Sequence, residues 1–314
     1  MKPVYIINGF LESGKTSFFA YTIGQPYFRA KGLTLLISCE EGTVGYGPKL
    51  LSATKTVMEN IENEEDFTPA KLMELDSKYH PERILIEWNG MWNYRNMRLP
   101  HSWSIEQQIT TIDASTFSVY FTNMKSLLAE QIRSSELIMF NRCDDVDENV
   151  LHGYKRNVKA INPKADLIFE DKEGEIDMTT EEDLPFDINN DPIMLEGINF
   201  GIWYIDAMEH PDRYAGKTVR YTGQVMKPPD LPKDTFIPGR PAMTCCAQDM
   251  SFIGFPAKSD RIAELKEHAW IDITADVAVE DFPGYDSPGV VLKVKKLEAT
   301  EKPEHPVIDF SQQA

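Results

Sequence analysis

A short segment near the start of the chain combines two glycines, a lysine and a hydroxyl side chain. Residues 9–18 read GFLESGKTSF. The spacing G-x-x-x-x-G-K-S/T is met by Gly9, Gly14, Lys15 and Thr16. The glycines let successive backbone N–H groups point inward, where they and the N-terminus of a following helix can hold a phosphate. Lys15 would then reach the β- and γ-phosphates of a nucleotide, and the Thr16 hydroxyl would bind Mg²⁺.

The flanking residues favour this interpretation over a turn with an exposed lysine. The apolar run VYIIN precedes the segment and predicts a buried strand, and FFAYTI after it predicts a helix. A strand, a glycine-bounded loop and a helix in this order are the context that the phosphate-binding motif requires. The loop residues expected to contact the nucleotide are Gly9, Glu12, Ser13, Gly14, Lys15, Thr16 and Ser17.

A second candidate site, for a nucleotide base, is the tetrapeptide NRCD at residues 141–144, which follows the apolar run LIMF. Guanine presents an acceptor at O6 and donors at N1 and N2. Asp144 can accept from both donors while Asn141 ties the loop together, whereas the reversed edge of adenine would leave the carboxylate unpaired. The alternative is a polar strand-to-helix turn. We expect Asn141, Arg142 and Asp144 to bind the base and to favour GTP.

An acidic residue lies at the end of the apolar run ILIEW. Residues 87–90 read EWNG, so Glu87 stands at the C-terminal end of a predicted strand, where α/β sheets place their ligand chemistry. Glu87 could bind Mg²⁺ through water or orient the attacking water, and Gly90 would let the backbone approach a γ-phosphate closely. The alternative is a glutamate that caps the next element.

The pattern of apolar runs indicates the elements that position these residues. From residue 1 to about 170, short runs alternate with amphipathic stretches such as EDFTPAKLMELDSKY. The runs expected to form strands are VYIIN, TLLIS (34–38), ILIEW (84–88), ITTID (109–113), LIMFN (137–141) and ADLIF (165–169). Short buried strands separated by crossover helices predict an α/β fold with a mainly parallel sheet, as in a P-loop nucleotide hydrolase.

The composition changes after residue 170. The segment EDKEGEIDMTTEEDLPFDINNDP is rich in acids and turn formers and predicts an acidic linker over residues 176–198. Beyond it, the strand-like runs KTVRYTGQVM, MSFIGFPA, AWIDITADVAVE and GVVLKVKKLEA predict a small antiparallel barrel or sandwich. One helix is expected at SDRIAELKEH, residues 259–268. We therefore expect a nucleotide-binding domain over residues 1–175 and a smaller β-rich domain over residues 199–314.

The overall composition limits the partners. Acidic residues outnumber basic ones by 50 to 32, which gives a net charge of −18. Because this charge repels phosphate polyanions, we expect no nucleic-acid partner. The four cysteines form no disulfide framework and fit a reducing, cytoplasmic setting. No apolar run approaches the length of a membrane span and the first residues show no signal-peptide cleavage site, so we expect no direct membrane insertion.

Taken in order, these motifs resemble those of the CobW-like P-loop GTPases, relatives of the nickel-insertion GTPases UreG and HypB. The resemblance covers residues 1–170 and rests on GFLESGKTSF, EWNG, TTIDASTF, EQIRSSELIMFNRCD and INPKA. It implies binding and hydrolysis of GTP with Mg²⁺ in the metallochaperone class. The segment CEEGTVGYG resembles the family's switch segment and retains Glu40. The resemblance therefore places Glu40 near the γ-phosphate with Lys15 and Glu87, and makes Thr16, Glu40 and Glu87 the expected Mg²⁺ ligands.

The chain departs from the family pattern at two places. Gly47 replaces an expected aspartate of the switch segment, and residues 59–66 read ENIENEED where the family carries a C-x-C-C metal motif. Without thiolates this segment lacks ligands for soft or borderline ions such as Zn²⁺ or Co²⁺. We expect no thiolate site there, and Mg²⁺ as the ion that the first domain requires.

An adjacent pair of cysteines lies in the second half. Cys245 and Cys246 are followed by Asp249. Neighbouring residues on a strand point to opposite faces, so one ion takes both thiolates only where a bulge or turn re-aims one of them. Two alternatives remain open: small buried apolar residues in a barrel, or a partial site for Zn²⁺ or another transition metal.

The second half resembles the C-terminal soluble domain of YcgQ-like proteins, which occur beside permeases. The matching residues are GKTVRYTGQV, RPAMTCCAQD and AWIDITADV, and the order of strands is similar to that of an OB-type barrel. Two functions follow for the whole chain. One is a GTP-hydrolysing switch that couples its nucleotide state to metal delivery or to contact with a metalloprotein client. The alternative is a regulatory GTPase module without a metal, which gates a protein partner such as a permease.

Overall fold

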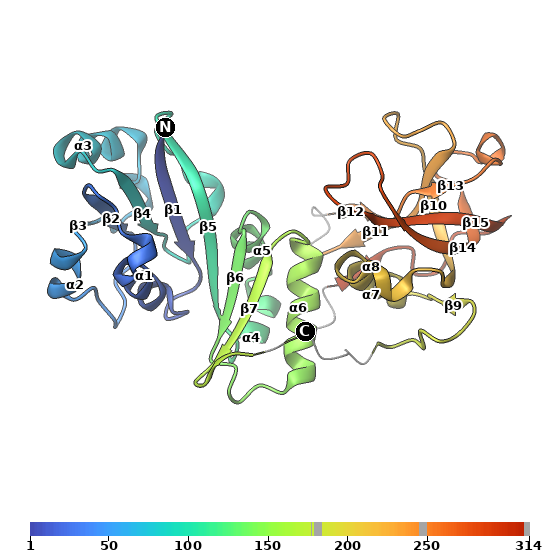
Figure 1. The fold of residues 1–314 in the computed structure, drawn as a ribbon, viewed down its shortest axis with the longest axis horizontal. Helices are drawn as coiled ribbons and strands as arrows, with labels where there is room; N and C mark the ends of the chain where they lie inside the picture. The colour runs from blue at the N-terminus through green and yellow to red at the C-terminus, as the bar shows by residue number, and fades with distance from the viewer. Residues whose placement is uncertain (177, 179–183, 245–249, 311–314) are drawn as a thin grey trace. The chain divides into compact units, whose positions relative to one another are not determined.

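The computed structural model describes residues 1–176, 178, 184–244 and 250–310, and the chain divides into two compact units, residues 1–180 and 181–313 (Figure 1). The first unit contains one sheet in the order β3-β2-β4-β1-β5-β6-β7-β8. Its strands are β1 (Lys2–Asn8), β2 (Thr34–Ser38), β3 (Thr56–Asn60), β4 (Arg83–Glu87), β5 (Trp103–Asp113), β6 (Leu137–Asn141), β7 (Asp166–Asp171) and β8 (Gly174–Glu175). All neighbouring strands from β3 to β7 run parallel, and β8 is antiparallel to β7.

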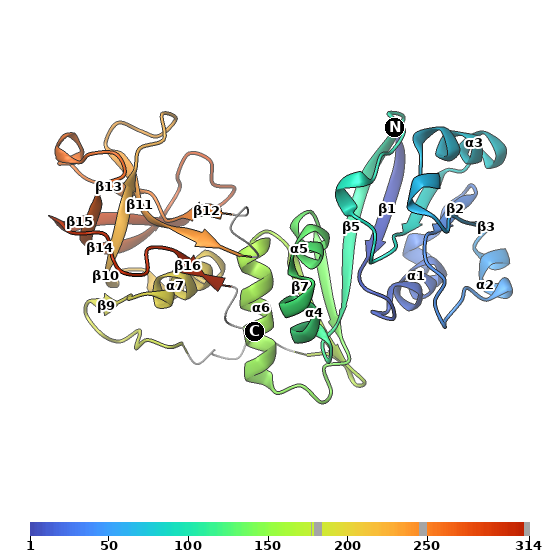
Figure 2. The same cartoon turned by 180° about the vertical axis from the view of Figure 1, so that it is seen from behind.

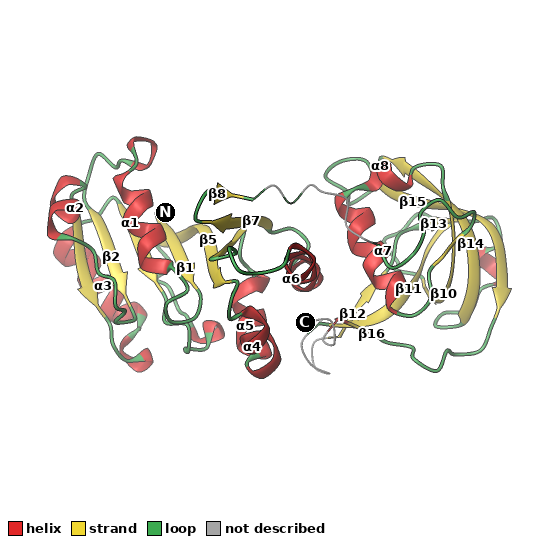
Figure 3. Cartoon of the chain, turned by 90° about the horizontal axis from the view of Figure 1, so that it is seen from below, coloured by secondary structure: helices red, strands yellow, loops and turns green. Residues whose placement is uncertain are grey.

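Helices cover both faces of this sheet, which is why its central strands are continuous apolar runs. On β4, Ile84 and Ile86 pack with Leu72 of α3, whereas Leu85 packs on the opposite face with Phe19 of α1. Figure 3 shows the yellow strands with red helices on either side, and α4 and α5 cover one face of β6 and β7 (Figures 1 and 2). The helices are α1 (Lys15–Gly24), α2 (Pro48–Ala53), α3 (Pro69–Tyr79), α4 (Phe117–Asn123), α5 (Lys125–Arg133) and α6 (Glu148–Ile161).

The expected parallel α/β sheet is confirmed, and each of the six predicted apolar runs forms a strand. Strand β3 was not predicted from the sequence. It lies at the edge of the sheet and pairs only with β2 among the described strands, so most of its residues are only partly buried and TVMEN shows no continuous apolar run.

The second unit is built around a closed barrel of five strands. Strand β10 pairs with both β11 and β14, β11 pairs with β13, and β15 joins β13 to β14, so the ring closes. The strands of this unit are β9 (Ile193–Met194), β10 (Thr218–Met226), β11 (Thr235–Met243), β12 (Met250–Ile253), β13 (Ala257–Lys258), β14 (Trp270–Glu280), β15 (Gly289–Ala299) and β16 (Ile308–Asp309). The predicted β-rich domain is confirmed as a barrel.

Helix α7 (Ile198–Glu209), followed by α8 (Pro211–Tyr214), packs against this barrel and was not predicted from the sequence. The rings of Phe200 and Trp203 meet Tyr221 of β10. Strand β9 and the first residue of α7 lie within the segment expected to be a linker. Among the described residues, no helix has both the length and the apolar character needed to cross a bilayer.

The prediction of a helix over residues 259–268 is wrong. The structure has only the 3-10 turn η4 (Ile262–Glu264) there, and the chain is extended again at Leu265. The ammonium of Lys227 donates to the carbonyl oxygens of Ile262 and Leu265, 3.0 and 2.5 Å away. These carbonyls are therefore bonded to a side chain from the end of β10, and this tertiary contact overrides the local helical pattern.

Candidate nucleotide-binding site

The phosphate-binding loop joins the C-terminal end of β1 to α1. Gly14, the residue before α1, has φ +99°, and a Cβ atom built on it would lie 2.6 Å from Nδ2 of Asn141. Both the left-handed backbone and the close neighbour require glycine at this position. The two ends of the candidate site, the loop and the NRCD segment after β6, are therefore in direct contact.

Two hydrogen bonds fix the loop from outside. The side-chain amide of Asn141 donates to the carbonyl of Ser13 at 2.6 Å, and the hydroxyl of Ser13 lies 2.8 Å from that of Thr111 on β5. The ring of Phe10 stacks on Tyr120 at 4.1 Å between centroids. Asn141 therefore ties the NRCD segment to the loop.

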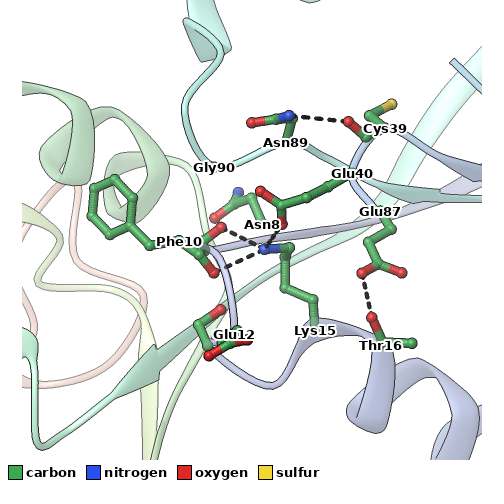
Figure 4. A network of polar contacts seen from close by, with 12 residues as sticks. Asn8, Phe10, Glu12, Lys15, Thr16, Cys39, Glu40, Glu87, Asn89 and Gly90 are labelled. Atoms are coloured by element: carbon green, nitrogen blue, oxygen red, sulfur yellow. Dashed lines mark hydrogen bonds and ion pairs between the residues drawn. The ribbon is translucent and has the colours of Figure 1, made fainter. Parts of the chain in front are cut away.

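Lys15 is buried at the first position of α1, with 3% of its surface exposed. Its ammonium donates to the carbonyl oxygens of Gly9 and Phe10, at 2.8 and 2.9 Å, and forms an ion pair with Glu40 at 2.5 Å (Figure 4). The lysine that should bind phosphates is thus held by the loop and by the segment that follows β2. A phosphate entering this site meets a preformed cation whose present anionic partner is Glu40.

Glu87, at the end of β4, is paired through both of its oxygens. The hydroxyl of Thr16 donates to Oε1 at 2.6 Å, as Figure 4 shows, and the phenol of Tyr46 donates to Oε2 at 2.6 Å. Burial, together with the charge of Glu87, raises the pKa of Tyr46, so the phenol remains a donor. Tyr46 lies in the segment CEEGTVGYG but was not among the expected site residues, because its partner Glu87 is 41 positions away in the chain.

Two adjoining hollows border this cluster. One, of about 130 Å³, lies over the loop, and its lining includes Leu11, Glu12, Gly14, Lys15, Thr16, Ser17 and Arg142. The other, of about 410 Å³, lies beside the segment after β2 and shares Thr16, Glu40 and Glu87 with the first. Residues 60–62, from the segment where the family carries its thiolate motif, line the larger hollow.

Glu12 occupies a loop position at which the family pattern has glycine, and its φ of +61° is left-handed. Its carboxylate accepts from the hydroxyl of Thr43 at 3.5 Å, and its carbonyl accepts from Arg142 at 2.9 Å. Arg142, itself at φ +55°, also forms an ion pair with Asp113. Arg142 therefore connects the NRCD segment to the loop and to the end of β5.

Asp144, expected to recognise guanine, is exposed at the end of the NRCD segment. Its Oδ1 accepts from the backbone N–H of Lys172 at 3.1 Å, and the ammonium of Lys172 lies 3.7 Å away. Its neighbour Cys143 is buried and directed toward the carbonyl of Phe140 at 3.7 Å. The carboxylate thus has one local partner and an exposed edge free to accept further donors.

A buried thiol lies behind the cluster. Cys39 follows β2 and is 1% exposed, and burial and the charges of Glu87 and Glu40 raise its pKa. Its carbonyl accepts from the side-chain amide of Asn89 at 3.1 Å (Figure 4). The thiol is therefore protonated and packed, as a small apolar group would be.

Two carboxylates of the acidic segment 59–66 contact side chains from other parts of the first unit. Glu59 is an acceptor for the ammonium of Lys78 at 2.9 Å, and Oε1 of Glu64 accepts from Asn96 at 2.8 Å. Within the part of the chain that the structure describes, no group of three or more His, Cys, Asp or Glu side chains is arranged to hold a metal ion. The candidate transition-metal ligands Cys245, Cys246 and Asp249 lie outside the described residues.

Comparison with known families decides the assignment of the first unit. Residues 3–169, more than half of the chain, match the model of the CobW/HypB/UreG nucleotide-binding domain. The chain belongs to the CobW/HypB/UreG family. This match confirms the family inferred from the motifs, whose members are P-loop GTPases. Residues 171–308 match the DUF1980 C-terminal domain, with which the resemblance to YcgQ-like proteins is consistent.

Two solved structures are similar to this CobW/HypB/UreG chain. The hydrogenase maturation factor HypB from Archaeoglobus fulgidus is 18% identical, with a TM-score of 0.40, and the match covers 55% of this chain and 82% of that one. The Zn(II)-bound YjiA GTPase from E. coli is 17% identical, with a TM-score of 0.41, and the match covers 81% of this chain and 94% of that one. The comparison with curated proteins finds no match.

Proposed function

We propose that the chain binds and hydrolyses GTP and uses its nucleotide state to control metal delivery or contact with a client protein. The proposal rests mainly on the paired side chains beside the phosphate-binding loop: Lys15 with Glu40 at 2.5 Å and Thr16 with Glu87 at 2.6 Å. These are the residue types that phosphoryl transfer requires, a cation for the phosphates and oxygen groups for a metal ion.

Lys15 is the proposed counterion of the β- and γ-phosphates. It is buried, so its charge acts in a medium of low dielectric and stabilises negative charge that develops on the transferred phosphoryl group. Its carbonyl partners on Gly9 and Phe10 hold the ammonium at the loop. When phosphates bind, Glu40 must give up its ion pair with Lys15, and the segment after β2 is therefore coupled to the nucleotide.

Thr16 and Glu87 are the proposed Mg²⁺ site, with Glu40 as a further acidic group. A hydroxyl and carboxylates are hard oxygen ligands of the kind Mg²⁺ prefers, so the residues present fit this ion. Mg²⁺ bound with the nucleotide would neutralise charge on the phosphates. Glu87 would hold the ion through water or orient the attacking water, and Tyr46 fixes the direction of its second oxygen.

Asn141, Arg142 and Asp144 are the proposed base-recognition residues. Asn141 and Arg142 both donate to carbonyl oxygens of the loop, at Ser13 and Glu12. The residues proposed to bind the base would therefore be hydrogen-bonded directly to the loop proposed to bind the phosphates. Asp144 would accept from the two donors of guanine, which adenine does not offer in this arrangement.

A second candidate is a GTPase switch that carries no transition metal and contacts a protein partner through the DUF1980-like unit. Two features of residues 59–66 favour this alternative: the segment contains no cysteine, and Glu59 and Glu64 already bond to Lys78 and Asn96. Metal analysis of the purified full chain with and without GTP separates the two candidates. Zinc, nickel or cobalt held in a nucleotide-dependent way supports metal delivery.

Release of inorganic phosphate from GTP and from ATP, measured with Mg²⁺ present, tests the shared GTPase proposal. We expect hydrolysis of GTP only, and a loss of about a hundredfold or more in Lys15→Ala. Lys49→Ala, at an exposed position on α2, is the matched control and should keep wild-type activity. Equal turnover in Lys15→Ala and wild type would overturn the proposal.

A further inference from the structure

Gly90 lies directly against the phosphate-binding loop. A Cβ atom built on it would be 2.2 Å from the carbonyl oxygen of Gly9 and 2.7 Å from Cα of Phe10, so only glycine fits (Figure 4). Gly90 also follows Glu87 by three residues on the segment after β4. The position of Gly90 and the first turn of the loop are therefore mechanically linked, since neither backbone can shift toward the other.

Gln131 of α5 reaches this glycine from a distant part of the chain. Its side-chain amide donates to the carbonyl of Gly90 at 2.8 Å, and the residue has no exposed surface. Because a carbonyl accepts and cannot donate, the nitrogen must be the atom that faces Gly90. Gln131 is thus the side chain that fixes the orientation of the Gly90 peptide.

The surroundings of Gln131 hold its backbone rigidly. Its carbonyl oxygen accepts from Thr110 at 3.0 Å, from Ser135 at 2.9 Å and from the side-chain amide of Gln108 at 3.2 Å. The other end of its own side chain, Oε1, is buried and finds no partner among the described residues. An unpaired buried acceptor costs free energy, so the bond to Gly90 holds the side chain in this orientation against that cost.

We propose that Gln131 is a positioning residue for nucleotide binding, which acts by holding Gly90 against the first turn of the phosphate-binding loop. This inference rests on the proposed GTPase function, in which Gly90 lies at the γ-phosphate. Gln131 then fixes the position of the Gly90 backbone beside the terminal phosphate. Because Gln131 belongs to α5, a movement of Gly90 also moves this helix. The residue favours binding of a nucleoside triphosphate over the corresponding diphosphate.

The test measures the affinities of the full chain for GTPγS and for GDP with Mg²⁺ present. Gln131→Met keeps the length of the side chain and removes the donor, and Gln131→Glu places an acceptor against the Gly90 carbonyl. We expect either variant to lose about three- to tenfold in affinity for GTPγS, the usual worth of one hydrogen bond, with GDP affinity unchanged. Preference for GTPγS as strong in both variants as in wild type would overturn the inference.

Gln108→Met is the matched control. Gln108 is a buried glutamine of the same network. It bonds to Tyr94, to Ser135 and to the backbone carbonyl of Gln131, but not to Gly90. It should lower the melting temperature and leave the ratio of GTPγS to GDP affinity unchanged. An equal change of this ratio in Gln108→Met would show that any damage to the network suffices, and would overturn the specific role of Gln131.

Hydrogen–deuterium exchange of the wild-type chain gives a result that does not depend on a variant folding. We expect the amides of residues 125–133 to exchange more slowly with GTPγS than with GDP. Identical protection in both states would overturn the link between Gly90 and α5. Wild type that binds neither nucleotide would instead overturn the proposed function, and this inference with it.

Discussion

The ammonium of Lys15 lies 2.5 Å from Oε2 of Glu40, and both side chains are almost completely shielded from water, with 3% and 9% of their surfaces exposed. The lysine of the phosphate-binding loop is therefore already neutralised by a residue of the protein. Any phosphate that binds Lys15 has to compete with this carboxylate. Because Glu40 begins the segment that continues to Tyr46, displacement of Glu40 also affects the group that holds Glu87.

Glu40→Gln separates the two roles of this carboxylate. Without Mg²⁺ we expect the variant to bind GDP roughly tenfold more tightly, since the charged competitor for Lys15 is gone. With Mg²⁺ we expect slower GTP hydrolysis, since a proposed ligand of the ion is lost. Calorimetric titration with GDP in the presence of a Mg²⁺ chelator measures the first effect. Weaker GDP binding under those conditions would contradict competition at Lys15.

Asp144→Asn should change which base is bound while leaving the fold intact. The asparagine carbonyl can still accept from the N–H of Lys172, the contact made by Asp144 at 3.1 Å. Loss of the carboxylate should reduce the preference for GTP over ATP by about tenfold or more, because a bond to a charged group is lost. Xanthosine triphosphate, which carries a carbonyl in place of the N2 amino group, should bind better to the variant than to wild type. Unchanged selectivity in both competitions would exclude Asp144 from base recognition.

Glu12→Gly should stabilise the nucleotide-free chain. Glu12 has φ +61°, a conformation that costs a side-chain-bearing residue about 1–2 kcal/mol, and glycine gives back about 0.4–1 kcal/mol through the entropy of the unfolded chain. The relief of the left-handed strain outweighs the greater entropy of the unfolded glycine chain. We therefore expect the free energy of unfolding, measured by urea denaturation, to rise by about 0.5–1 kcal/mol. Glu41→Gly, at an exposed position without positive φ, is the control and should not stabilise.

The sequence predicts those parts of the site that are encoded locally. GFLESGKTSF contains the complete residue spacing of the phosphate-binding motif. The strands around it are buried on both faces, so they are continuous apolar runs. Tyr46 and Gln131 could not be assigned to the site in the same way. Each reaches it through a contact 41 residues away in the chain, with Glu87 and with Gly90. Both residues lie in segments that resemble family motifs, CEEGTVGYG and EQIRSSELIMFNRCD. Their partners, however, are set by the packing of the whole sheet and its helices, which no local pattern encodes.

The second unit shows the opposite error, in which a strong local pattern is overridden. SDRIAELKEH has helical spacing, yet Lys227 donates to two of its carbonyl groups and the segment forms only a short turn. Strand β11 was not among the predicted strands, and it contains two prolines, Pro238 and Pro241, a residue type that is disfavoured inside strands. The sequence leaves a barrel and a sandwich open, and the choice between them depends on pairings between distant strands.

The Cys143 thiol should make stability depend on pH in the alkaline range. Burial raises its pKa from the ordinary 9.0 to about 11, so the folded chain keeps this proton to higher pH than the unfolded chain. Its stabilisation is complete below about pH 9 and is lost as the pH rises through about 11. We expect the free energy of unfolding, from urea denaturation, to fall more steeply across this range in wild type than in Cys143→Ala. Parallel slopes would contradict burial of the thiol.

Zinc binding should depend on the cysteine pair of the second unit. Residues 59–66 supply no thiolate, and Glu59 and Glu64 are already paired, so the first unit should need only Mg²⁺. Thiolates bind Zn²⁺ strongly and must lose a proton to do so, so affinity should fall as the pH is lowered. We expect Zn²⁺ affinity, measured against a competing chelator on the full chain, to be lost in the Cys245→Ser/Cys246→Ser variant. Cys143→Ser is the control and should keep it. Tight zinc retained by the double variant would show that zinc binding does not depend on this cysteine pair.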